Sequence, residues 1–361
     1  MAGFNRHRLT VARRRRGLSK TELAQAAGVT TRAITDHEAG NKTPSPETLE
    51  MFSVVLGFPL EFFSKGRIDV MESDSVSFRS LKSMTSWQRD AALAACSIAM
   101  ELSEWIEKRF SLPDPDLPPM ADTAPEAAAI ELRTRWGIGL RPIRNMVHLL
   151  EQRGVRIFSL SEKSRDIDAF SFWKSGKPYC FLNTMKSAEH SRFDAAHELF
   201  HLVAHRHGAP NGREAERQAD AFASAFLMPR ETVRAHVRLG ATRPDLIKAK
   251  RIWHVSLAAL ANRSHRVGLI SDWQYRGLCI EMGQRGDRTT EPEPMPVRET
   301  SQILAKVFAA LREEGVSRRE VARELSIRQP DLDELIFGLL LISVDGTGNG
   351  GKPTSRLSLV T

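Results

Sequence analysis

The chain carries the stretch Arg192-Phe-Asp-Ala-Ala-His-Glu-Leu-Phe-His-Leu202, in which His197 and His201 stand four residues apart. Apolar residues recur around the two histidines at helical spacing, which predicts an amphipathic helix. Residues four apart lie on one face of a helix, so both imidazoles can reach a single metal ion. Glu198 stands beside that face, where a carboxylate can act as general base toward water. The stretch therefore predicts a zinc site with its own base.

A second helical segment follows, Glu214-Ala-Glu-Arg-Gln-Ala-Asp-Ala-Phe-Ala-Ser-Ala-Phe-Leu-Met-Pro229, and its proline ends the predicted helix. Glu216 and Asp220 are four residues apart and share one of its faces. We expect Glu216 to be the third ligand and Asp220 to accept a hydrogen bond from a ligating imidazole. Two histidines, one carboxylate and a water form a catalytic zinc site, because one position stays open.

Other residues remain candidates for the third position. His207 stands ten residues after His197, as in three-histidine proteases, but that geometry requires a glycine where this chain has Ala204. Glu214 is a minor alternative. His205 extends the histidine face by another turn, and we expect it to be a solvated or capping residue rather than a ligand.

The first 65 residues have a separate pattern of short helices. Three helices are predicted before residue 41, and the glycines at their ends are Gly17, Gly28 and Gly40. Two further helices, over 45–56 and 59–63, complete a five-helix domain. The apolar residues with the spacing that locks two helices at a short turn are Leu23, Ala24, Val29 and Ile34. The pattern predicts a helix-turn-helix domain over residues 1–65.

Basic residues concentrate in the same module. Residues 1–45 hold nine lysines and arginines against three acids, a net charge of +6 out of +8 for the whole chain. In a helix-turn-helix domain, the third helix enters the major groove and its N-terminal side chains meet base edges. The base-reading candidates are Thr30, Thr31, Arg32 and Thr35. The phosphate-contact candidates, which add affinity without sequence preference, are Arg13, Arg14, Arg15, Arg16, Lys20 and Lys42.

Composition narrows the class of protein further. A chain of 361 residues with 41% hydrophobic residues is long enough for two or three domains with real cores. There is no apolar run long enough to span a bilayer and no leader pattern, so we expect a soluble, cytoplasmic protein. Three cysteines without paired spacing argue against a disulfide framework or a zinc ribbon.

The segments 192–202 and 216–229 resemble the ImmA/IrrE family of metallopeptidases in content and in order. The segments 168–173 and 178–183, around Lys174-Ser-Gly-Lys177, resemble that family's strand hairpin. The chain departs from the family at Phe200, where members usually carry glycine, which affects local packing rather than the ligands. Residues 1–65 are similar to the XRE/Cro class of DNA-binding domains.

The resemblance implies a zinc endopeptidase that cleaves a helix-turn-helix repressor and so switches on a stress, DNA-damage or anti-phage response. It implies one zinc per chain, with manganese as a substitute in vitro. The implied partners are the repressor and duplex DNA, with single-stranded DNA as a candidate activator, and a homodimer is left open. The alternative is a DNA-binding regulator whose zinc site is regulatory or vestigial. Glu198 favours the enzyme, since a structural site needs no base.

These patterns predict an α+β fold that is mostly α. A five-helix helix-turn-helix domain over 1–65 is followed by a helical connector over 66–120, which ends in a proline-rich spacer. A zincin-like metallopeptidase core with a small sheet covers 121–285, and 286–296 reads as a linker. Three roles are open for the helical region 297–361: a sensor, a second DNA-binding unit, or a cap over the peptidase.

The predicted hairpin also offers a place for substrate. A strand at the edge of a sheet can bind an extended peptide by adding it as a further strand. We expect this edge to be either Ala169–Trp173 or Tyr179–Leu182.

Overall fold

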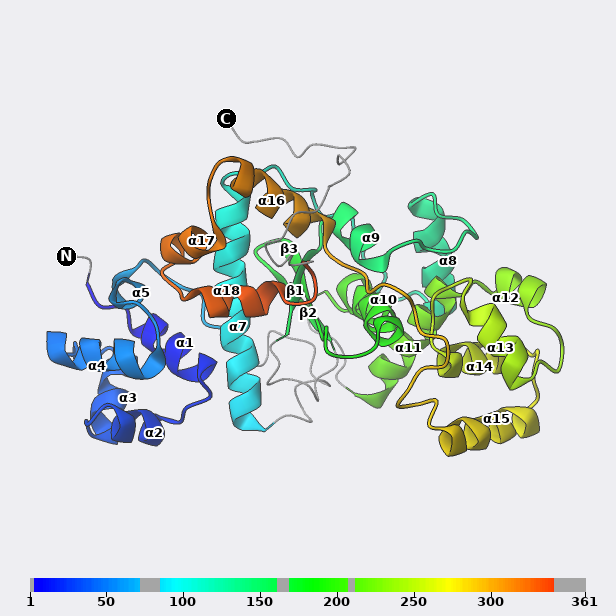
Figure 1. The fold of residues 1–361 in the computed structure, drawn as a ribbon, viewed down its shortest axis with the longest axis horizontal. Helices are drawn as coiled ribbons and strands as arrows, with labels where there is room; N and C mark the ends of the chain where they lie inside the picture. Colours follow the sequence, from blue (N-terminus) through cyan, green and yellow to red (C-terminus); the bar gives the residue numbers. More distant parts are fainter. Residues whose placement is uncertain (1–2, 72–84, 161–168, 207–211, 341–361) are drawn as a thin grey trace. The chain divides into compact units, whose positions relative to one another are not determined.

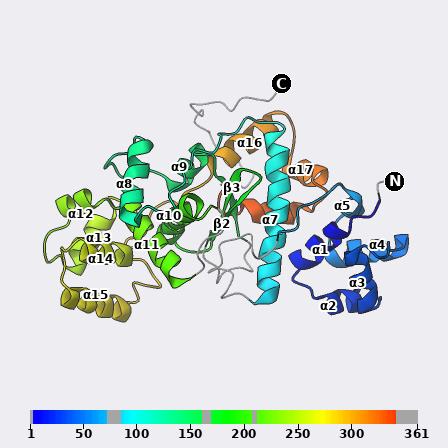
Figure 2. The same ribbon diagram turned by 180° about the vertical axis from the view of Figure 1, so that it is seen from behind.

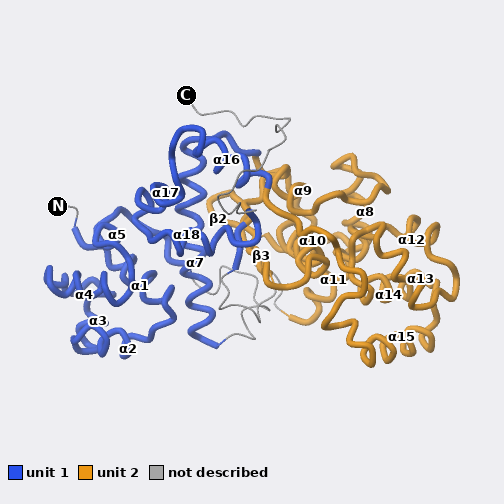
Figure 3. The backbone as a smooth tube through the Cα atoms, in the orientation of Figure 1, with its two compact units in different colours: residues 1–113, 158–167, 302–361 blue, residues 114–157, 168–301 orange. Residues whose placement is uncertain are grey.

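The computed structural model describes residues 3–71, 85–160, 169–206 and 212–340. These residues form many helices and one three-stranded sheet, which confirms the predicted mostly helical α+β class. The chain divides into two compact units, coloured separately in Figure 3, of which one comprises 1–113, 158–167 and 302–361 and the other 114–157 and 168–301. Within the described ranges, every helix is too short or too polar to span a bilayer.

Five short helices in the first unit confirm the predicted helix-turn-helix domain (Figure 1). Their bounds are α1 Arg6–Arg15, α2 Lys20–Ala26, α3 Thr31–Ala39, α4 Pro46–Leu56 and α5 Leu60–Ser64. Ser19 caps α2 in a capping box with Glu22, and the Thr30 hydroxyl caps α3. The side chains buried between the helices include Leu9, Leu23, Ile34, Phe52 and Phe62.

Arg13 joins α1 to α3 through an ion pair with Glu38. Its Nε and Nη2 atoms donate to the two carboxylate oxygens at 2.6 and 3.1 Å. Both side chains are buried, and a two-point contact of this kind fixes orientation as well as distance. Arg13 therefore positions α3 from the inside of the domain.

The first unit also contains the long helix α7 and three C-terminal helices. Their bounds are α7 Ser86–Glu107, α16 Gln302–Glu313, α17 Arg318–Glu324 and α18 Gln329–Ile336. Helix α7 packs along α1, and its Glu101 accepts hydrogen bonds from Arg8. Glu324 accepts hydrogen bonds from Trp105 at 2.9 Å and from Arg109 at 2.5 Å. The C-terminal helices are thus part of the helix-turn-helix unit.

Acidic side chains of α18 hold the end of the arginine run on α1. Asp331 accepts hydrogen bonds from Arg16 at 2.6 and 2.9 Å and lies 3.7 Å from Arg15. Glu334 accepts a further hydrogen bond from Arg15. The expectation of a phosphate-facing run therefore does not fit the structure here, because Arg13 and Arg15 are buried and Arg16 is already paired with a carboxylate. Charge clustering along a sequence does not reveal such pairing.

We predict that Asp331→Ala destabilises the first unit by about 3 kcal/mol, because Arg16 loses its carboxylate partner and the buried Arg15 keeps only Glu334. On the same helix, Asp333→Ala removes a half-exposed ion pair with Arg318 and should cost less than about 1 kcal/mol. Hydrogen exchange of α1 and α18 peptides in the full chain measures the difference. Equal acceleration of exchange in the two variants would contradict this role of Asp331.

The second unit contains the strand pair β2 and β3 and helices that precede and follow it. Those before and after the sheet are α8 Pro125–Arg135, α9 Met146–Gln152, α10 Ala188–Ala204, α11 Arg213–Leu227, α12 Arg230–His236, α13 Arg243–Lys250, α14 Leu257–Arg266 and α15 Asp272–Arg285. Helix α10 packs on β2, β3, α9 and α11, and it lies next to α11 in both Figure 1 and Figure 2. The chain thus brings the two segments singled out in the sequence side by side.

The sheet has the strand order β1-β3-β2, with β1 Arg156–Ser159, β2 Phe170–Lys174 and β3 Lys177–Leu182. The hairpin predicted from the sequence is confirmed, since β2 and β3 pair antiparallel with Lys174 opposite Lys177. Ser175 and Gly176 both have positive φ, at 51° and 75°, as a two-residue type I′ turn requires. Because β3 lies in the centre, the expected peptide edge at Tyr179–Leu182 is wrong. The other expected edge, in β2, is at the border of the sheet.

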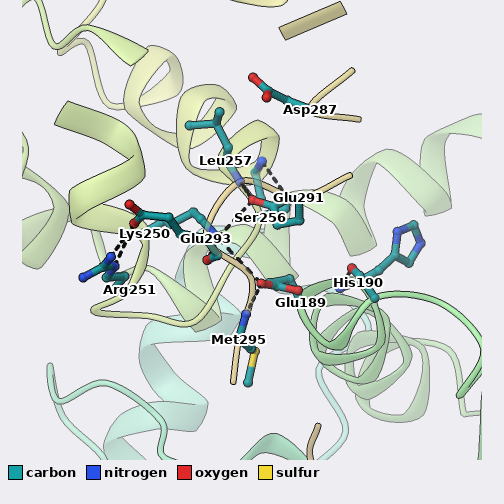
Figure 4. Close-up of polar contacts among 12 residues, drawn as sticks. Glu189, His190, Lys250, Arg251, Ser256, Leu257, Asp287, Glu291, Glu293 and Met295 are labelled. Carbon is teal, nitrogen blue, oxygen red and sulfur yellow. Dashed lines mark hydrogen bonds and ion pairs between the residues drawn. The ribbon is translucent and has the colours of Figure 1, made fainter. Parts of the chain in front are cut away.

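Residues 286–299 are anchored to the second unit, although their composition predicts a linker over 286–296. Lys250 is buried and its Nζ lies 3.0 Å from Glu291, while Glu189 accepts a hydrogen bond from the backbone N–H of Met295 at 2.6 Å (Figure 4). Further along, Glu299 pairs with the buried Arg192 of α10. Acidic residues of this segment meet basic residues from distant helices, and local composition cannot anticipate those partners.

Part of the proline-rich spacer also packs on the second unit. Asp116 accepts a hydrogen bond from Arg153 at 2.9 Å, and the backbone at Asp114 and Pro115 passes directly over Gly154. A Cβ atom at Gly154 would lie 2.5 Å from that backbone, and its φ of +79° also favours glycine. This end of the segment is therefore a packed connection rather than a free spacer.

Candidate metal centre and nucleic-acid interface

Helix α10 presents the two histidines of the motif on one face, as predicted. Ser187 caps its first turn by accepting from the backbone N–H of His190. Phe200 and Leu199 are buried on the remaining faces, with Phe200 against Phe222 of α11. The apolar residues hold α10 in place, so the imidazole face is directed to the interface with α11.

His197, His201 and Glu216 bring one ligand atom each to a common point. The two Nε2 atoms lie 3.2 Å apart. A carboxylate oxygen of Glu216 lies 3.2 Å from Nε2 of His197, and the other lies 3.8 Å from Nε2 of His201. Ligands at about 2.0–2.1 Å from a tetrahedral zinc ion are separated by roughly 3.3 Å, so the donor set and its spacing fit zinc.

The outward nitrogens of both imidazoles also have partners. Asp220 Oδ1 lies 2.9 Å from Nδ1 of His197, as predicted for this residue. Nδ1 of His201 lies 2.9 Å from Nδ1 of His205, which caps the C-terminal end of α10. Both rings are thereby turned with Nε2 toward the common point, which is how outer partners orient metal-ligating histidines. The capping position of His205 agrees with the expectation, but its contact with His201 was not predicted.

The Glu198 carboxylate is buried and is held by a residue that the sequence did not reveal. The hydroxyl of Ser171, on β2, donates to it at 2.6 Å. Burial raises the pKa of Glu198 to about 7, against opposing effects of His197 and of this hydrogen bond. A carboxyl group with that pKa can exchange protons near neutral pH. Ser171 alternates with two phenylalanines in β2, and no local signal distinguishes it from an ordinary strand serine.

The two imidazoles differ in their electrostatics. Burial alone would lower the pKa of His197, but hydrogen bonds to Asp220 and Glu216 outweigh it and raise the pKa to about 10. Burial and the neighbouring His197 keep the pKa of His201 well below its usual range. The carboxylates therefore favour a positive charge at His197. A bound metal ion would supply this charge in place of a proton.

Of the two alternative third ligands, Glu214 and His207, only Glu214 is among the described residues, and it lies outside this group. Glu214 is exposed, and its carboxylate accepts hydrogen bonds from Arg217 and Gln218. His207 lies outside the described residues. Glu216 is thus the carboxylate that the fold places beside the two histidines.

The predicted base-reading residues all lie on the exposed N-terminal part of α3 or its cap. Thr30, Thr31, Arg32 and Thr35 are exposed, and buried Ile34 holds the opposite face of the helix. Lys42 is exposed just after α3, whereas Lys20 is half-buried and lies 3.6 Å from Glu38.

Arg14 was also a predicted phosphate contact. It is half-buried, and its Nε lies 3.8 Å from a carboxylate oxygen of Asp90 on α7. The arginine run therefore faces several directions within the first unit instead of forming one basic surface.

Comparison with protein families finds a match for each of the two domains. Residues 150–265 match the model of the IrrE N-terminal-like domain, a peptidase family, and residues 11–63 match the helix-turn-helix model. The chain joins an IrrE N-terminal-like peptidase domain to a helix-turn-helix domain. No curated protein matches the chain. All three candidate ligands, with Glu198, Ser171 and Asp220, fall within the matched part of the IrrE N-terminal-like domain.

Strand β2 connects the sheet of the IrrE N-terminal-like domain to this site. Its Trp173 donates from Nε1 to the backbone oxygen of Leu202 on α10 at 2.9 Å. Ser171, two residues earlier, points to Glu198. Among the described residues β2 has a single strand neighbour, β3, so its other edge is at the border of the sheet.

We predict that Asp220→Ala lowers the affinity of the IrrE N-terminal-like domain for zinc by about 10–100-fold, because His197 loses the group that orients it. Glu214→Ala on the same helix is the matched control, since its carboxylate is exposed and turned to Arg217. Competition with a coloured zinc chelator measures both affinities. The predicted arrangement would be wrong if the two variants bound zinc equally well.

Proposed function

We propose that this chain is a zinc-dependent endopeptidase that cleaves a helix-turn-helix transcriptional repressor. The observation that carries the proposal is the buried Glu198 carboxylate next to a group of two imidazoles and one carboxylate. Three protein ligands leave a fourth position for the reaction, whereas a structural zinc site closes that position with a fourth protein ligand. A general base beside a structural site would have no use.

Each residue of the site would have a separate role in hydrolysis. His197, His201 and Glu216 would hold zinc, which when bound supplies a Lewis acid for the scissile carbonyl and the attacking water. Glu198 would accept a proton from that water and return it to the leaving amine. Ser171 holds the Glu198 carboxylate in place for both transfers. Asp220 and His205 keep the two imidazoles turned toward the metal position.

Substrate would bind as an extended segment along the outer edge of β2, the edge without a strand neighbour among the described residues. Backbone hydrogen bonds of this kind give affinity with little sequence preference. Such a segment must be exposed and unfolded locally, as interdomain linkers and loops are. This favours cleavage of the repressor at a single accessible bond, with release of transcription in a stress, DNA-damage or anti-phage response.

The helix-turn-helix domain would bind DNA with α3 in the major groove. Exposure of Thr30, Thr31, Arg32 and Thr35 supports this role, and Lys42 would contact phosphate. DNA bound here would bring the peptidase to its repressor or signal damage, with single-stranded DNA as a candidate activator. A regulator without peptidase activity is the alternative, and the following experiment separates the two.

We predict that Glu198→Gln keeps the zinc and loses at least about 100-fold in cleavage rate, because the proton acceptor is gone. His201→Ala should lose most of the zinc as well. Each protein is mixed with the repressor encoded beside its gene, zinc or manganese, and single- or double-stranded DNA, and products are mapped by mass spectrometry. Glu214→Gln serves as the exposed control. The enzyme proposal fails if wild-type protein cuts nothing in every combination.

We predict that the full chain binds duplex DNA with affinity that falls steeply with salt, because phosphate contacts release counterions. Arg32→Ala should lose about 1–3 kcal/mol on a preferred site and little on random DNA. Arg319→Ala, an exposed arginine on α17, is the control. Fluorescence anisotropy at several salt concentrations measures each, and salt-independent binding would leave this domain as a protein-contact module.

A further inference from the structure

A cavity of about 410 Å³ opens between α10, α11 and α14 in the second unit. Its lining includes Phe193, Asp220, Ser224, Ala259, Asn262 and Arg266. Phe193 lies four residues before His197, and Asp220 lies four residues after Glu216. On each helix the cavity is therefore one turn away from a candidate metal ligand.

Asp220 belongs to the cavity and to the metal centre at once. One of its oxygens faces Nδ1 of His197 at 2.9 Å, while about half of the side chain is exposed, at 52%. The cavity therefore adjoins the metal centre at the side chain that orients His197. Cavities of roughly 300–1,000 Å³ are the usual size for small-ligand sites, so this one can hold a side chain with its own backbone.

The lining is apolar on one side and polar on the other. Phe193, Ala258 and Ala259 can pack against the aliphatic part of a side chain. Asn262 and Arg266 supply hydrogen-bond donors, and Asn262 Nδ2 is 3.1 Å from the hydroxyl of Tyr275. The Ser224 hydroxyl is buried and has no hydrogen-bond partner among the described residues.

Arg266 is the residue that determines which ligand charge the cavity would bind. It is exposed at the cavity, and it forms none of the ion pairs found in the described parts of the chain, whereas the neighbouring Arg263 is occupied by Glu126. The one carboxylate of the lining, Asp220, contacts His197 with one oxygen, although about half of its side chain is exposed. His190, also in the lining, lies 3.5 Å from Asp194 outside it. Arg266 is therefore the cation of the lining that an acidic ligand can bind.

We propose that this cavity is a specificity subsite that takes an acidic side chain, glutamate or aspartate, next to the scissile bond. The apolar wall would contact its methylene carbons, and Arg266 would bind its carboxylate with charge-assisted hydrogen bonds. The inference rests on the proposed peptidase function. It adds what edge binding at β2 lacks, namely selection by side chain, because backbone contacts to a strand do not distinguish residues.

The cleavage test uses the zinc-loaded full chain and a library of blocked octapeptides with glutamate, glutamine, lysine or leucine at each position. Wild-type protein should prefer glutamate over lysine by about ten-fold or more in kcat/KM at one position beside the cut. Arg266→Glu should reverse that preference and leave the zinc content unchanged. Arg276→Glu, an exposed arginine on α15, should leave the preference intact. Cleavage with the same preference in Arg266→Glu and wild type would overturn the proposal.

A binding test separates this proposal from the proposed activity. Saturation-transfer NMR on zinc-loaded Glu198→Gln protein compares N-acetylglutamate methylamide with N-acetyllysine methylamide. Preference for the glutamate compound that Arg266→Glu reverses supports the subsite even if no peptide is cut, in which case the peptidase function alone fails. Equal binding of both compounds, with or without cleavage, would overturn the subsite.

Discussion

The packing of α10 against α11 is the constraint on which the candidate site depends. Each helix contributes polar groups to a shared interface, where His201 and Glu216 are buried and His197 is nearly so. Burying such groups is costly unless they are hydrogen-bonded and their charge is balanced. Glu198 adds a second carboxylate to the same region. The carboxylates therefore favour a positive charge between the helices, which a protonated His197 or a bound cation would supply, and a bound cation would couple their packing to metal binding.

The sequence was informative where function follows from spacing within one element. His197 and His201 on α10, and Glu216 and Asp220 on α11, each lie one turn apart, and helical periodicity places such pairs on one face. The hairpin was equally predictable, because its two-residue turn and alternating strands are local. These local rules sufficed to name the ligand group, although they could not show that the two helices would face each other.

Contacts between distant segments were beyond those rules. Ser171 reaches Glu198 from a strand, and only the packing of β2 on α10 makes that pairing. The arginine run on α1 looked like a DNA-binding surface because its acidic partners come from other helices, and Asp331 of α18 lies hundreds of residues away. The segment 286–296 looked like a linker because its basic partners, Lys250 and Arg251, lie on another part of the chain. For both charged segments, the composition showed the charges correctly. It could not show which residues of opposite charge would pair with them.

Zinc K-edge anomalous diffraction from crystals of the zinc-loaded full chain would locate the metal directly. We expect one zinc per chain with His197, His201 and Glu216 as its protein ligands, at about 2.0–2.2 Å, and with Glu198 uncoordinated. A fourth protein ligand closing the site, a zinc bound by other residues, or no anomalous signal at this position would show that these residues do not form a catalytic zinc site.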